Sequence, residues 1–514
     1  MEAITWTLVA IMLSMLVYRY IRLKRKELYW KEKEVGFCKA EYFLSGLLQL
    51  IKNQPILETW YNQYKEFPNH KFVAVENLNK TMLMARDPEF VKKIAINDFQ
   101  YFVDHGEYKS DKGTLINLGL FSLTGNEWRG FRAKLSPTFT TGKLKSMFVE
   151  MEPCCDALLH NIGKTCENPD YDIRDDIMTY AMDVSASVIF GIELRNKELR
   201  EKYKKTFSQL FDSSTIRLFI YSILSKFPRL TKMLNLKIVE RKMEEFFKDI
   251  IKQTFEQRKA NNTHRNDYVQ LLLNLKESGN LEVKVKDPDD DYLKTEDVHI
   301  ENVEVTDDIL SAQAFQFLTG GFEPIYNTML MFLIEVARCE DIQVKLRKEI
   351  KEVKAKYGGY VYNSLKEMVY LEQCIQETLR KYPVVPFLMR YCVKDYVVND
   401  RLTIENGTQI FVSLQGIQND PAYFPNPEKF DPDRFRPNES IKNLAYLPFG
   451  EGPRLCIGMR FAMMEIKLGL AKILEQFSIS PGEKAKYPIE MKRKGLFLCP
   501  CRGYLKMSKI TITQ

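Results

Sequence analysis

The chain has 514 residues, 45% of them hydrophobic, without internal repeats or low-complexity tracts, so we expect one large globular body. Lysine and arginine exceed aspartate and glutamate by 75 to 68, a net charge of +7. No basic run with interleaved aromatic residues accompanies this mild excess, which argues against a nucleic-acid partner. A local basic face for an acidic protein and an ordinary solvated surface both remain open.

The ten cysteines and five histidines are scattered along the chain, with no CxxC pair and no framework spacing. This argues against a zinc site or a disulfide scaffold and favours a reducing compartment. Most of the cysteines are expected to be small core residues.

The N-terminus carries an apolar segment, residues 3–18, followed by a basic cluster. Extended through Ile21, the segment is about 19 residues long, or roughly 28 Å as a helix, close to the hydrocarbon thickness of a bilayer. A cleaved signal peptide carries positive charge before its apolar run, whereas here Glu2 precedes the run and basic residues end it. We therefore expect an uncleaved transmembrane anchor over residues 1–29, with the body in the cytosol by the positive-inside rule.

In the body, residues 72–84 and 396–412 alternate around asparagine-containing turns, a pattern typical of β-hairpins. Most of the remainder has helical periodicity, and the longest predicted helix runs from about residue 305 to residue 337. The acidic stretch that contains residues 287–291 is expected to be a loop between helices. The expected fold is mainly α with small peripheral β-sheets, in a single catalytic domain over residues 30–514.

Residues 449–462, FGEGPRLCIGMRFA, predict a turn-rich loop that presents Cys456 and then starts a helix. A thiolate ligand needs backbone amides close to its sulfur, and Gly452 and Gly458 allow that approach. Arg454 can clamp a carboxylate through two hydrogen bonds. An isolated cysteine before a helix is more often a packed core thiol, so the surrounding pattern decides between the two interpretations.

That pattern is Phe449-x-x-Gly452-x-Arg454-x-Cys456-x-Gly458. It resembles the haem-binding signature of the cytochrome P450 superfamily at every position. The resemblance implies the cytochrome P450 fold, haem b as cofactor, and Cys456 as the axial ligand whose thiolate favours O–O cleavage. It further implies that Arg454 holds a haem propionate and that Phe449 and Gly450 belong to the cofactor-binding loop.

Two further segments resemble haem surroundings in this family. Glu377 and Arg380 share one face of a predicted helix, and with Arg434 they resemble the Glu-Arg-Arg network that locks the cysteine loop. Breaking such a buried network costs about 3–5 kcal/mol. Trp128 and Arg132, at i and i+4 of another predicted helix, resemble residues that contact the haem propionates.

Residues 137–148 and 312–315 look most like the insect microsomal branch of the family, many of whose members oxidise xenobiotics, hormones or plant toxins. A lipophilic substrate is therefore expected in an apolar pocket. The predicted pocket residues are Phe315, Val385, Phe387 and Phe497. Ordinary core packing is the alternative for each of them. The apolar stretch 216–224 is either an entrance lip that dips into the bilayer or part of the core.

Within the long predicted helix, residues 319–325 resemble the oxygen-activation segment of the family. By this resemblance Gly320 and Gly321 leave space over the iron, and Glu323 fills the acidic position. Pro324, however, stands where the family has a threonine whose hydroxyl helps to deliver protons to dioxygen. Inside a helix this proline also removes the bond to the carbonyl of Gly320 and costs about 3 kcal/mol.

Two enzymatic functions remain open because of this proline. In the first, Thr319 or an ordered water replaces the hydroxyl, and the enzyme is a monooxygenase that uses O2 and NADPH. In the second, the enzyme rearranges or dehydrates an already oxygenated substrate without activating O2. A non-enzymatic haem carrier or sensor is disfavoured, because it needs neither the glycine pair of the long helix nor a substrate wall.

The chain has no flavin or nicotinamide fingerprint, so its electrons come from a partner. The resemblance implies NADPH-cytochrome P450 reductase, with cytochrome b5 as an optional second partner, and an endoplasmic reticulum membrane with the catalytic domain on the cytosolic face. The basic residues expected to dock the reductase are Lys134, Lys143, Lys145 and Arg460. Residues 30–46 lack the proline-rich hinge usual in the family, which leaves the orientation of the body on the membrane open.

Overall fold

The computed structural model describes residues 2–38, 56–77, 80–105, 114–192, 197–211, 241–262, 265, 267–286, 298–437, 444–492 and 497–510. Residues 216–224 and the acidic stretch 287–297 lie outside the described residues. The chain divides into two compact units. The sheet unit comprises Met1–Gly106 and Phe387–Ile417, and the helical unit comprises Glu107–Pro386 and Gln418–Gln514.

The sheet unit is built on a five-stranded mixed sheet in the order β1-β2-β3-β10-β7. Its strands are β1 (Gly36–Cys38), β2 (Phe72–Asn77), β3 (Lys80–Ala85), β7 (Phe387–Tyr391) and β10 (Gln409–Ser413). β2 and β3 pair antiparallel, which confirms the hairpin predicted over residues 72–84. β1 lies parallel to β2, and β10 lies between β3 and β7, parallel to the first and antiparallel to the second.

The second predicted hairpin, residues 396–412, is only partly confirmed. β8 (Tyr396–Val397) and β9 (Thr403–Ile404) pair as a short antiparallel hairpin. The following residues belong to β10, which joins the larger sheet instead. Four of the five residues of β10 are buried, as expected for a central strand covered on both faces.

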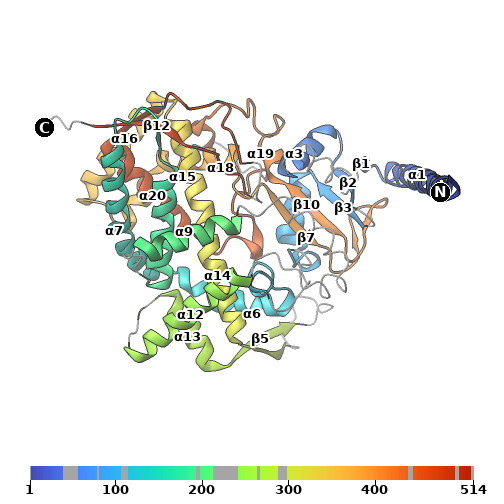
Figure 1. The fold of residues 1–514 in the computed structure, drawn as a ribbon, viewed down its shortest axis with the longest axis horizontal. Helices are drawn as coiled ribbons and strands as arrows, with labels where there is room; N and C mark the ends of the chain where they lie inside the picture. The colour runs from blue at the N-terminus through green and yellow to red at the C-terminus, as the bar shows by residue number, and fades with distance from the viewer. Residues whose placement is uncertain are drawn as a thin grey trace. The chain divides into compact units, whose positions relative to one another are not determined.

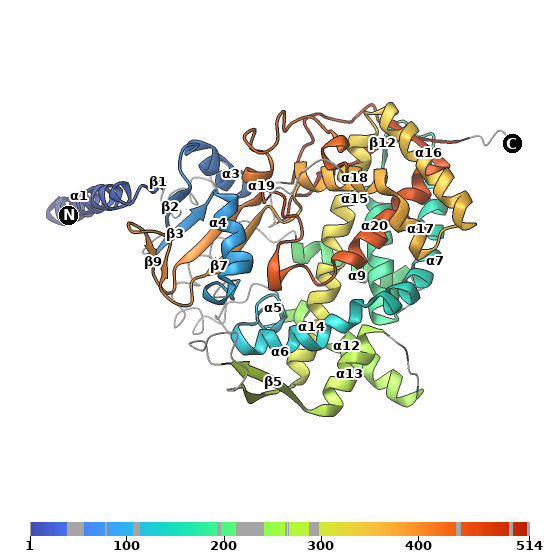
Figure 2. The ribbon, with the colours of Figure 1, turned by 180° about the vertical axis from the view of Figure 1, so that it is seen from behind.

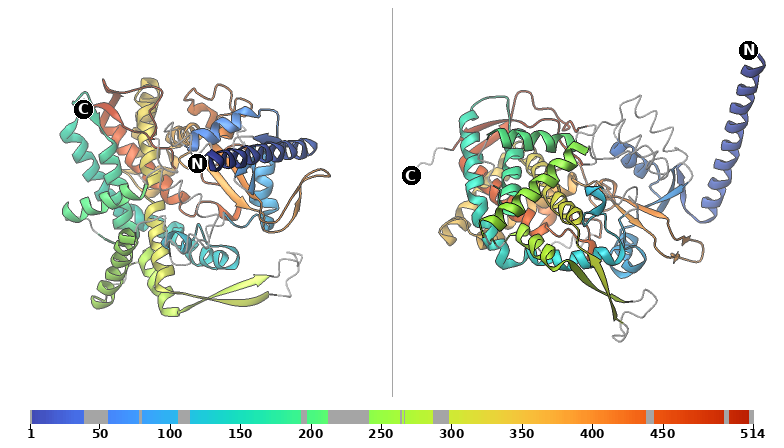
Figure 3. Two further views of the ribbon diagram at one scale, coloured as in Figure 1. Left: turned by 45° about the vertical axis from the view of Figure 1, so that its right-hand side comes forward. Right: turned by 60° about the horizontal axis from the view of Figure 1, so that its bottom comes forward.

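The helices of the sheet unit include one long N-terminal helix that Figure 3 shows without interruption. They are α1 (Glu2–Glu32), α3 (Ile56–Glu66) and α4 (Pro88–Lys92), and α19 (Leu414–Gln418) follows β10. Among the described residues, α1 is the one helix long and apolar enough to cross a membrane. Its large apolar side chains are exposed, with Leu13 at 56% and Leu16 at 53%. These properties fit a membrane anchor.

The helical unit accounts for most of the described chain, so the prediction of a mainly α fold with small sheets is confirmed (Figures 1 and 2). Its helices are α5 (Leu115–Leu118), α6 (Gly125–Leu135), α7 (Thr141–Thr165), α8 (Arg174–Val184), α9 (Lys197–Phe211), α12 (Arg241–Ala260), α13 (Tyr268–Ser278), α14 (Asp307–Gly320), α15 (Glu323–Val336), α16 (Glu340–Tyr357), α17 (Tyr362–Glu367), α18 (Val369–Lys381) and α20 (Met459–Gln476). Its strands are β4 (Tyr171–Asp172), β5 (Asn280–Lys286), β6 (Val298–Glu304), β11 (Phe477–Pro481) and β12 (Tyr504–Lys509).

The core of the helical unit surrounds α15. This helix packs against α8, α18 and α20, and each of its residues except Pro324 is buried. A helix that is apolar on all sides needs such complete cover. Two of these helices carry or adjoin predicted site residues: α18 contains Glu377 and Arg380, and α20 follows the cysteine loop.

The single long helix predicted over residues 305–337 is wrong in one respect, because the structure divides it into α14 and α15 at Gly321 and Phe322. Pro324 lies in the first turn of α15, where a missing N–H leaves no intrahelical bond unmade. The cost of about 3 kcal/mol for a proline in a helix interior therefore does not apply here.

Candidate active site

The cysteine loop is shaped by two glycines in the left-handed region, Gly450 at φ 74° and Gly452 at φ 71°. Only glycine adopts this conformation without strain. The turn closes through a bond from the Cys456 amide to the Phe449 carbonyl at 2.9 Å. Gly458 then precedes the first residue of α20, and a Cβ built there would approach only Phe139, at 4.0 Å. The backbone beside Cys456 is therefore uncrowded.

The sulfur of Cys456 is exposed, and its desolvation is partly offset by two backbone amides and one cation. The surrounding protein raises the pKa of this thiol by desolvation, while hydrogen bonds from the Gly458 and Met459 amides and the charge of Arg132 lower it. All ten cysteines are described, and Cys456 is the one whose side chain is exposed. An uncovered sulfur with two amides and a cation beside it suits a thiolate that binds a metal.

Two arginines and a tryptophan predicted to contact the cofactor gather around this loop. The guanidinium of Arg454 lies 4.0 Å from the centre of the Trp128 ring. Arg132, on α6 one turn after Trp128, donates to the carbonyl of Leu455 at 2.7 Å. Burial lowers the pKa of Arg132, and the nearby Cys456 opposes that shift. The structure therefore brings Cys456, Arg454, Arg132 and Trp128 into one cluster, which fits a cofactor that carries carboxylate groups.

The Glu377 network is assembled as the spacing predicts. Arg380 donates to both carboxylate oxygens of Glu377, at 2.7 and 3.0 Å, and both side chains are fully buried. Arg434 adds a longer ion pair, with its Nε 3.5 Å from Glu377 Oε1. Burial raises the pKa of Glu377, and the bonds from Arg380 oppose this. Asp431 donates its amide to the same carboxylate at 2.9 Å, which fixes the segment before Arg434.

The predicted oxygen-activation residues do not form one cluster. At Gly320 a Cβ would meet nothing within 4 Å, whereas at Gly321 it would meet Ile189 Cδ1 at 3.2 Å and Ser185 Oγ at 3.3 Å. The lack of a side chain at Gly321 therefore allows close packing against the π-helical turn Ser185–Ile189 that follows α8, a role not predicted from the sequence. Thr319 donates its hydroxyl to the carbonyl of Phe315 at 2.9 Å, so its proton is already used within α14.

The buried carboxylate of Glu323 bonds along its own helix. It accepts the hydroxyl of Tyr326 at 3.3 Å and the amide of Asn327 at 3.4 Å. Tyr326 also contacts the sulfur of Cys499 at 3.3 Å. Desolvation raises the pKa of Tyr326, which keeps this phenol protonated. Glu323 was predicted as the acidic residue of this segment, whereas Tyr326 was not predicted, although the i, i+3 spacing on α15 could have indicated it.

Of the four predicted pocket residues, three belong to the helical unit and Phe387 belongs to the sheet unit. Phe315 is buried and contacts Phe247 with ring centres 4.9 Å apart. Phe387 belongs to the sheet unit, where its ring packs on Trp60 at 5.0 Å. Val385 and Phe497 are half-buried in the helical unit.

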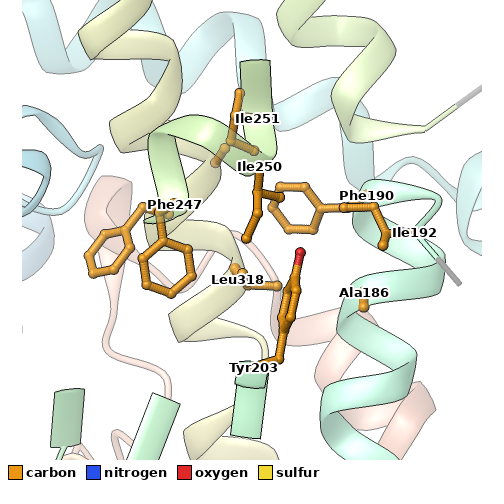
Figure 4. A pocket seen from close by; sticks show the side chains of 10 residues that line it. Ala186, Phe190, Ile192, Tyr203, Phe247, Ile250, Ile251 and Leu318 are labelled. Carbon is orange, nitrogen blue, oxygen red and sulfur yellow. The ribbon is translucent and has the colours of Figure 1, made fainter. Parts of the chain in front are cut away.

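Phe315 also lines a small apolar cavity among α9, α12 and α14, with a volume of about 10 Å³. Figure 4 shows the Tyr203 hydroxyl pointing toward Phe190 and Ile250 within it. A cavity of this size is at the lower limit for a single water.

Two arrangements escaped the sequence analysis. The side-chain amide of Gln313 donates to the Leu118 carbonyl at 2.7 Å and accepts from the Leu120 amide at 2.9 Å. Arg454 donates to the Leu120 carbonyl at 3.2 Å, so α14 and the cysteine loop hold the same short segment. In the sheet unit, burial lowers the pKa of Arg390 to about 10. Its position inside the otherwise apolar run of β7 could have indicated from the sequence that this arginine is buried.

A family model described as Cytochrome P450 matches residues 39–507 of this chain. The chain belongs to the cytochrome P450 family. Cytochromes P450 bind haem through a cysteine thiolate, and the cysteine loop described above has the donors that such a group needs. Membership also makes this chain an enzyme of the monooxygenase type, as the resemblance implied.

Similar cytochromes P450 come from insects, which confirms the predicted branch. Cytochrome P450 6B1 of Papilio polyxenes is 33% identical over 506 residues, covering 96% of this chain and 97% of that protein. Cytochrome P450 6a2 of Drosophila melanogaster is 31% identical over 531 residues, with 99% and 100% covered. Cytochrome P450 6k1 of Blattella germanica is 33% identical over 505 residues, with 96% and 95% covered.

Proposed function

We propose that this cytochrome P450 inserts one oxygen atom from O2 into a lipophilic small molecule, with electrons from NADPH delivered by NADPH-cytochrome P450 reductase. The observation that carries the proposal is the exposed sulfur of Cys456, which two backbone amides and Arg132 stabilise. In this proposal Cys456 would hold the haem iron through its sulfur, as a thiolate. When bound, the haem supplies the iron at which dioxygen is activated.

The other residues of the cluster hold the cofactor and its loop. Arg454, with Trp128 against its guanidinium, binds a haem carboxylate by charge-assisted hydrogen bonds. Arg132 is the second cation for these carboxylates, and it also lowers the pKa of Cys456. The buried pair of Glu377 and Arg380 fixes the segment that precedes the loop.

Proton supply is assigned to Glu323 with Tyr326 as its hydroxyl partner. The Thr319 hydroxyl donates within its own helix, so it is a poor substitute for the threonine that Pro324 replaces. The Tyr326 hydroxyl donates to Glu323 at 3.3 Å and so holds that carboxylate in place, while the phenol keeps its own proton. No specific observation favours the alternative in which the enzyme rearranges an oxygenated substrate.

The partners follow from charge and from the apolar N-terminal helix. Lys134, Lys145 and Arg460 are exposed in the helical unit and Lys143 is half-exposed, which suits an acidic reductase surface. Cytochrome b5 is an optional second partner on the same basis. We place the enzyme on the cytosolic face of the endoplasmic reticulum, with α1 as its anchor and the body attached through the basic residues that follow the apolar run.

The ligand assignment is tested by the absorption spectrum of the reduced carbon-monoxide complex. Wild type and Cys166→Ser, which changes a half-buried cysteine at the end of α7, should both show the red-shifted band of a thiolate-ligated haem. Cys456→Ser should lose that band. A red-shifted band that persists in Cys456→Ser would assign the iron to another residue.

The reaction type is tested by stoichiometry. NADPH consumed, peroxide released and product formed are measured with reductase over a panel of lipophilic compounds. Product that depends on NADPH and O2 supports the monooxygenase. Turnover of an organic peroxide without reductase, together with no turnover in its presence, would establish the isomerase or dehydratase instead.

A further inference from the structure

Two basic residues that follow the apolar run of α1 contact the sheet. Lys26 Nζ lies 2.6 Å from one carboxylate oxygen of Glu76 and 2.7 Å from the other. Arg22 Nη2 donates to Glu76 Oε1 at 3.1 Å. Glu76 is near the end of β2, and the Thr81 hydroxyl of β3 also reaches its carboxylate, at 3.4 Å. One carboxylate of the sheet therefore receives both cations of the anchor helix.

The burial of these groups distinguishes the contact from an ordinary surface ion pair. The Glu76 side chain is 1% exposed, whereas Arg22 and Lys26 are 32% and 27% exposed. A buried carboxylate is strongly disfavoured without a cation, whereas half-exposed lysine and arginine keep part of their hydration. The contact therefore fixes α1 to the sheet more strongly than the median exposed pair would.

The order of contacts along the chain shows which end of β2 lies nearer to the apolar run of α1. Arg22 and Lys26 meet Glu76, and after the end of the helix Gly36 pairs with Val73 in β1 and β2. The chain thus passes Glu76 before Val73 as it leaves the apolar run. Glu76 is therefore on the membrane side of β2, and Lys71, which precedes the strand, is on the far side.

We propose that Glu76, clamped by Arg22 and Lys26, holds this end of the β2–β3 hairpin in the phospholipid headgroup layer. Arg22 directly follows the apolar run, and Lys26 is about 6 Å further along a helix. That rise is comparable to the roughly 5–7 Å of headgroup region on each side of the hydrocarbon core. The clamp gives the sheet unit a fixed orientation on the bilayer without a proline-rich hinge. The inference rests on α1 being the membrane anchor.

The experiment places a fluorescent non-natural amino acid at position 80, the first residue of β3, or at position 71. The full-length haem-loaded enzyme is incorporated into phosphatidylcholine vesicles that contain a headgroup-attached quencher. We expect strong quenching at position 80 and weak quenching at position 71. Glu76→Gln should cause a several-fold loss of this difference, and Lys26→Gln a smaller loss.

Lys24→Gln is the matched control, because it removes the same charge from the same helix, while Lys24 pairs with Glu27 within α1 at 3.2 Å. It should leave the difference unchanged. Equal quenching at positions 71 and 80, or a difference unaffected by Glu76→Gln, would overturn the clamp. Vesicle flotation distinguishes failure of the clamp from failure of the anchor. If the wild type does not float with the vesicles, α1 is not a membrane anchor. The reduced carbon-monoxide spectrum verifies that each variant is folded.

Discussion

The cysteine loop and the junction between α14 and α15 are both short breaks beside glycines, but only the loop uses its glycines for a left-handed backbone. The loop closes on itself, through bonds such as the one from the Cys456 amide to the Phe449 carbonyl at 2.9 Å. The junction is held from afar, since Ser185 donates to the Gly321 carbonyl at 2.9 Å across 136 positions. A left-handed turn ties glycine to its position, whereas the junction, where Gly321 has a φ of −84°, tolerates a departure such as Pro324.

The largest expected effect comes from removing the charge that supports the loop. Glu377→Gln leaves the fully buried Arg380 without its carboxylate, and we expect a loss of about 3–5 kcal/mol in the free energy of unfolding. Denaturant unfolding of the haem-loaded enzyme measures it. The control is Asp433→Asn, which breaks a pair with the exposed Arg436 and should cost about 0–1 kcal/mol. Equal losses in both variants would show that the buried pair does not fix the loop.

The second-largest effect on stability is expected at Glu465, on α20, the helix that follows the cysteine loop. Glu465 is fully buried, and neither of its carboxylate oxygens has a hydrogen-bond partner among the residues that the structure describes. Desolvation raises its pKa well above the ordinary value of 4.5. The folded state therefore holds this proton more tightly than the unfolded state. Its contribution to stability is complete below about pH 4.5 and is lost as pH rises toward the folded-state pKa, by at most about 1.4 kcal/mol per pH unit.

Unfolding of wild type and Glu465→Gln from pH 5 to pH 8 tests this contribution. The glutamine cannot ionise, so the variant should lose less stability than wild type as pH rises. Parallel pH profiles would contradict it and would point to an unseen partner for the carboxylate.

A smaller effect is expected where the junction meets Glu323. Tyr326→Phe removes a hydrogen bond worth about 1 kcal/mol. We expect more peroxide and less product per NADPH, and a change in the infrared band of the Glu323 carboxyl. Thr319→Val is the comparison, because its hydroxyl donates to the Phe315 carbonyl within α14. If Thr319→Val uncouples the enzyme and Tyr326→Phe does not, the roles of the two hydroxyls are reversed.

The smallest change in stability is expected at Pro324. Because this proline lies in the first turn of α15, Pro324→Ala and Pro324→Thr should each change the unfolding free energy by less than about 1 kcal/mol. Only the threonine variant adds a hydroxyl, so it alone should improve the yield of product per NADPH. A gain of about 3 kcal/mol in both variants would instead indicate a proline inside a continuous helix.

Spacing along the sequence predicted local contacts, the family resemblance predicted the remote approach of Trp128 to Arg454, and other remote contacts were missed. Glu377 and Arg380 are three positions apart on one helix, so their contact followed from helical geometry. The hydrogen bond from the Gln313 side chain to the Leu118 carbonyl joins residues 195 positions apart, and no local sequence pattern predicts it. The continuous helix over residues 305–337 was wrong because hydrophobic periodicity continues across Gly321, whereas the backbone bonds do not.

The clamp at Glu76 also determines where this enzyme can be shortened for expression without its anchor. A chain that starts after residue 29 loses the apolar run together with Arg22 and Lys26, so Glu76, which is 1% exposed in the full chain, loses both cations. A chain that starts at Arg22 loses only the apolar run. The longer form should unfold at a higher temperature and aggregate less, although it carries more of the segment that such designs usually remove.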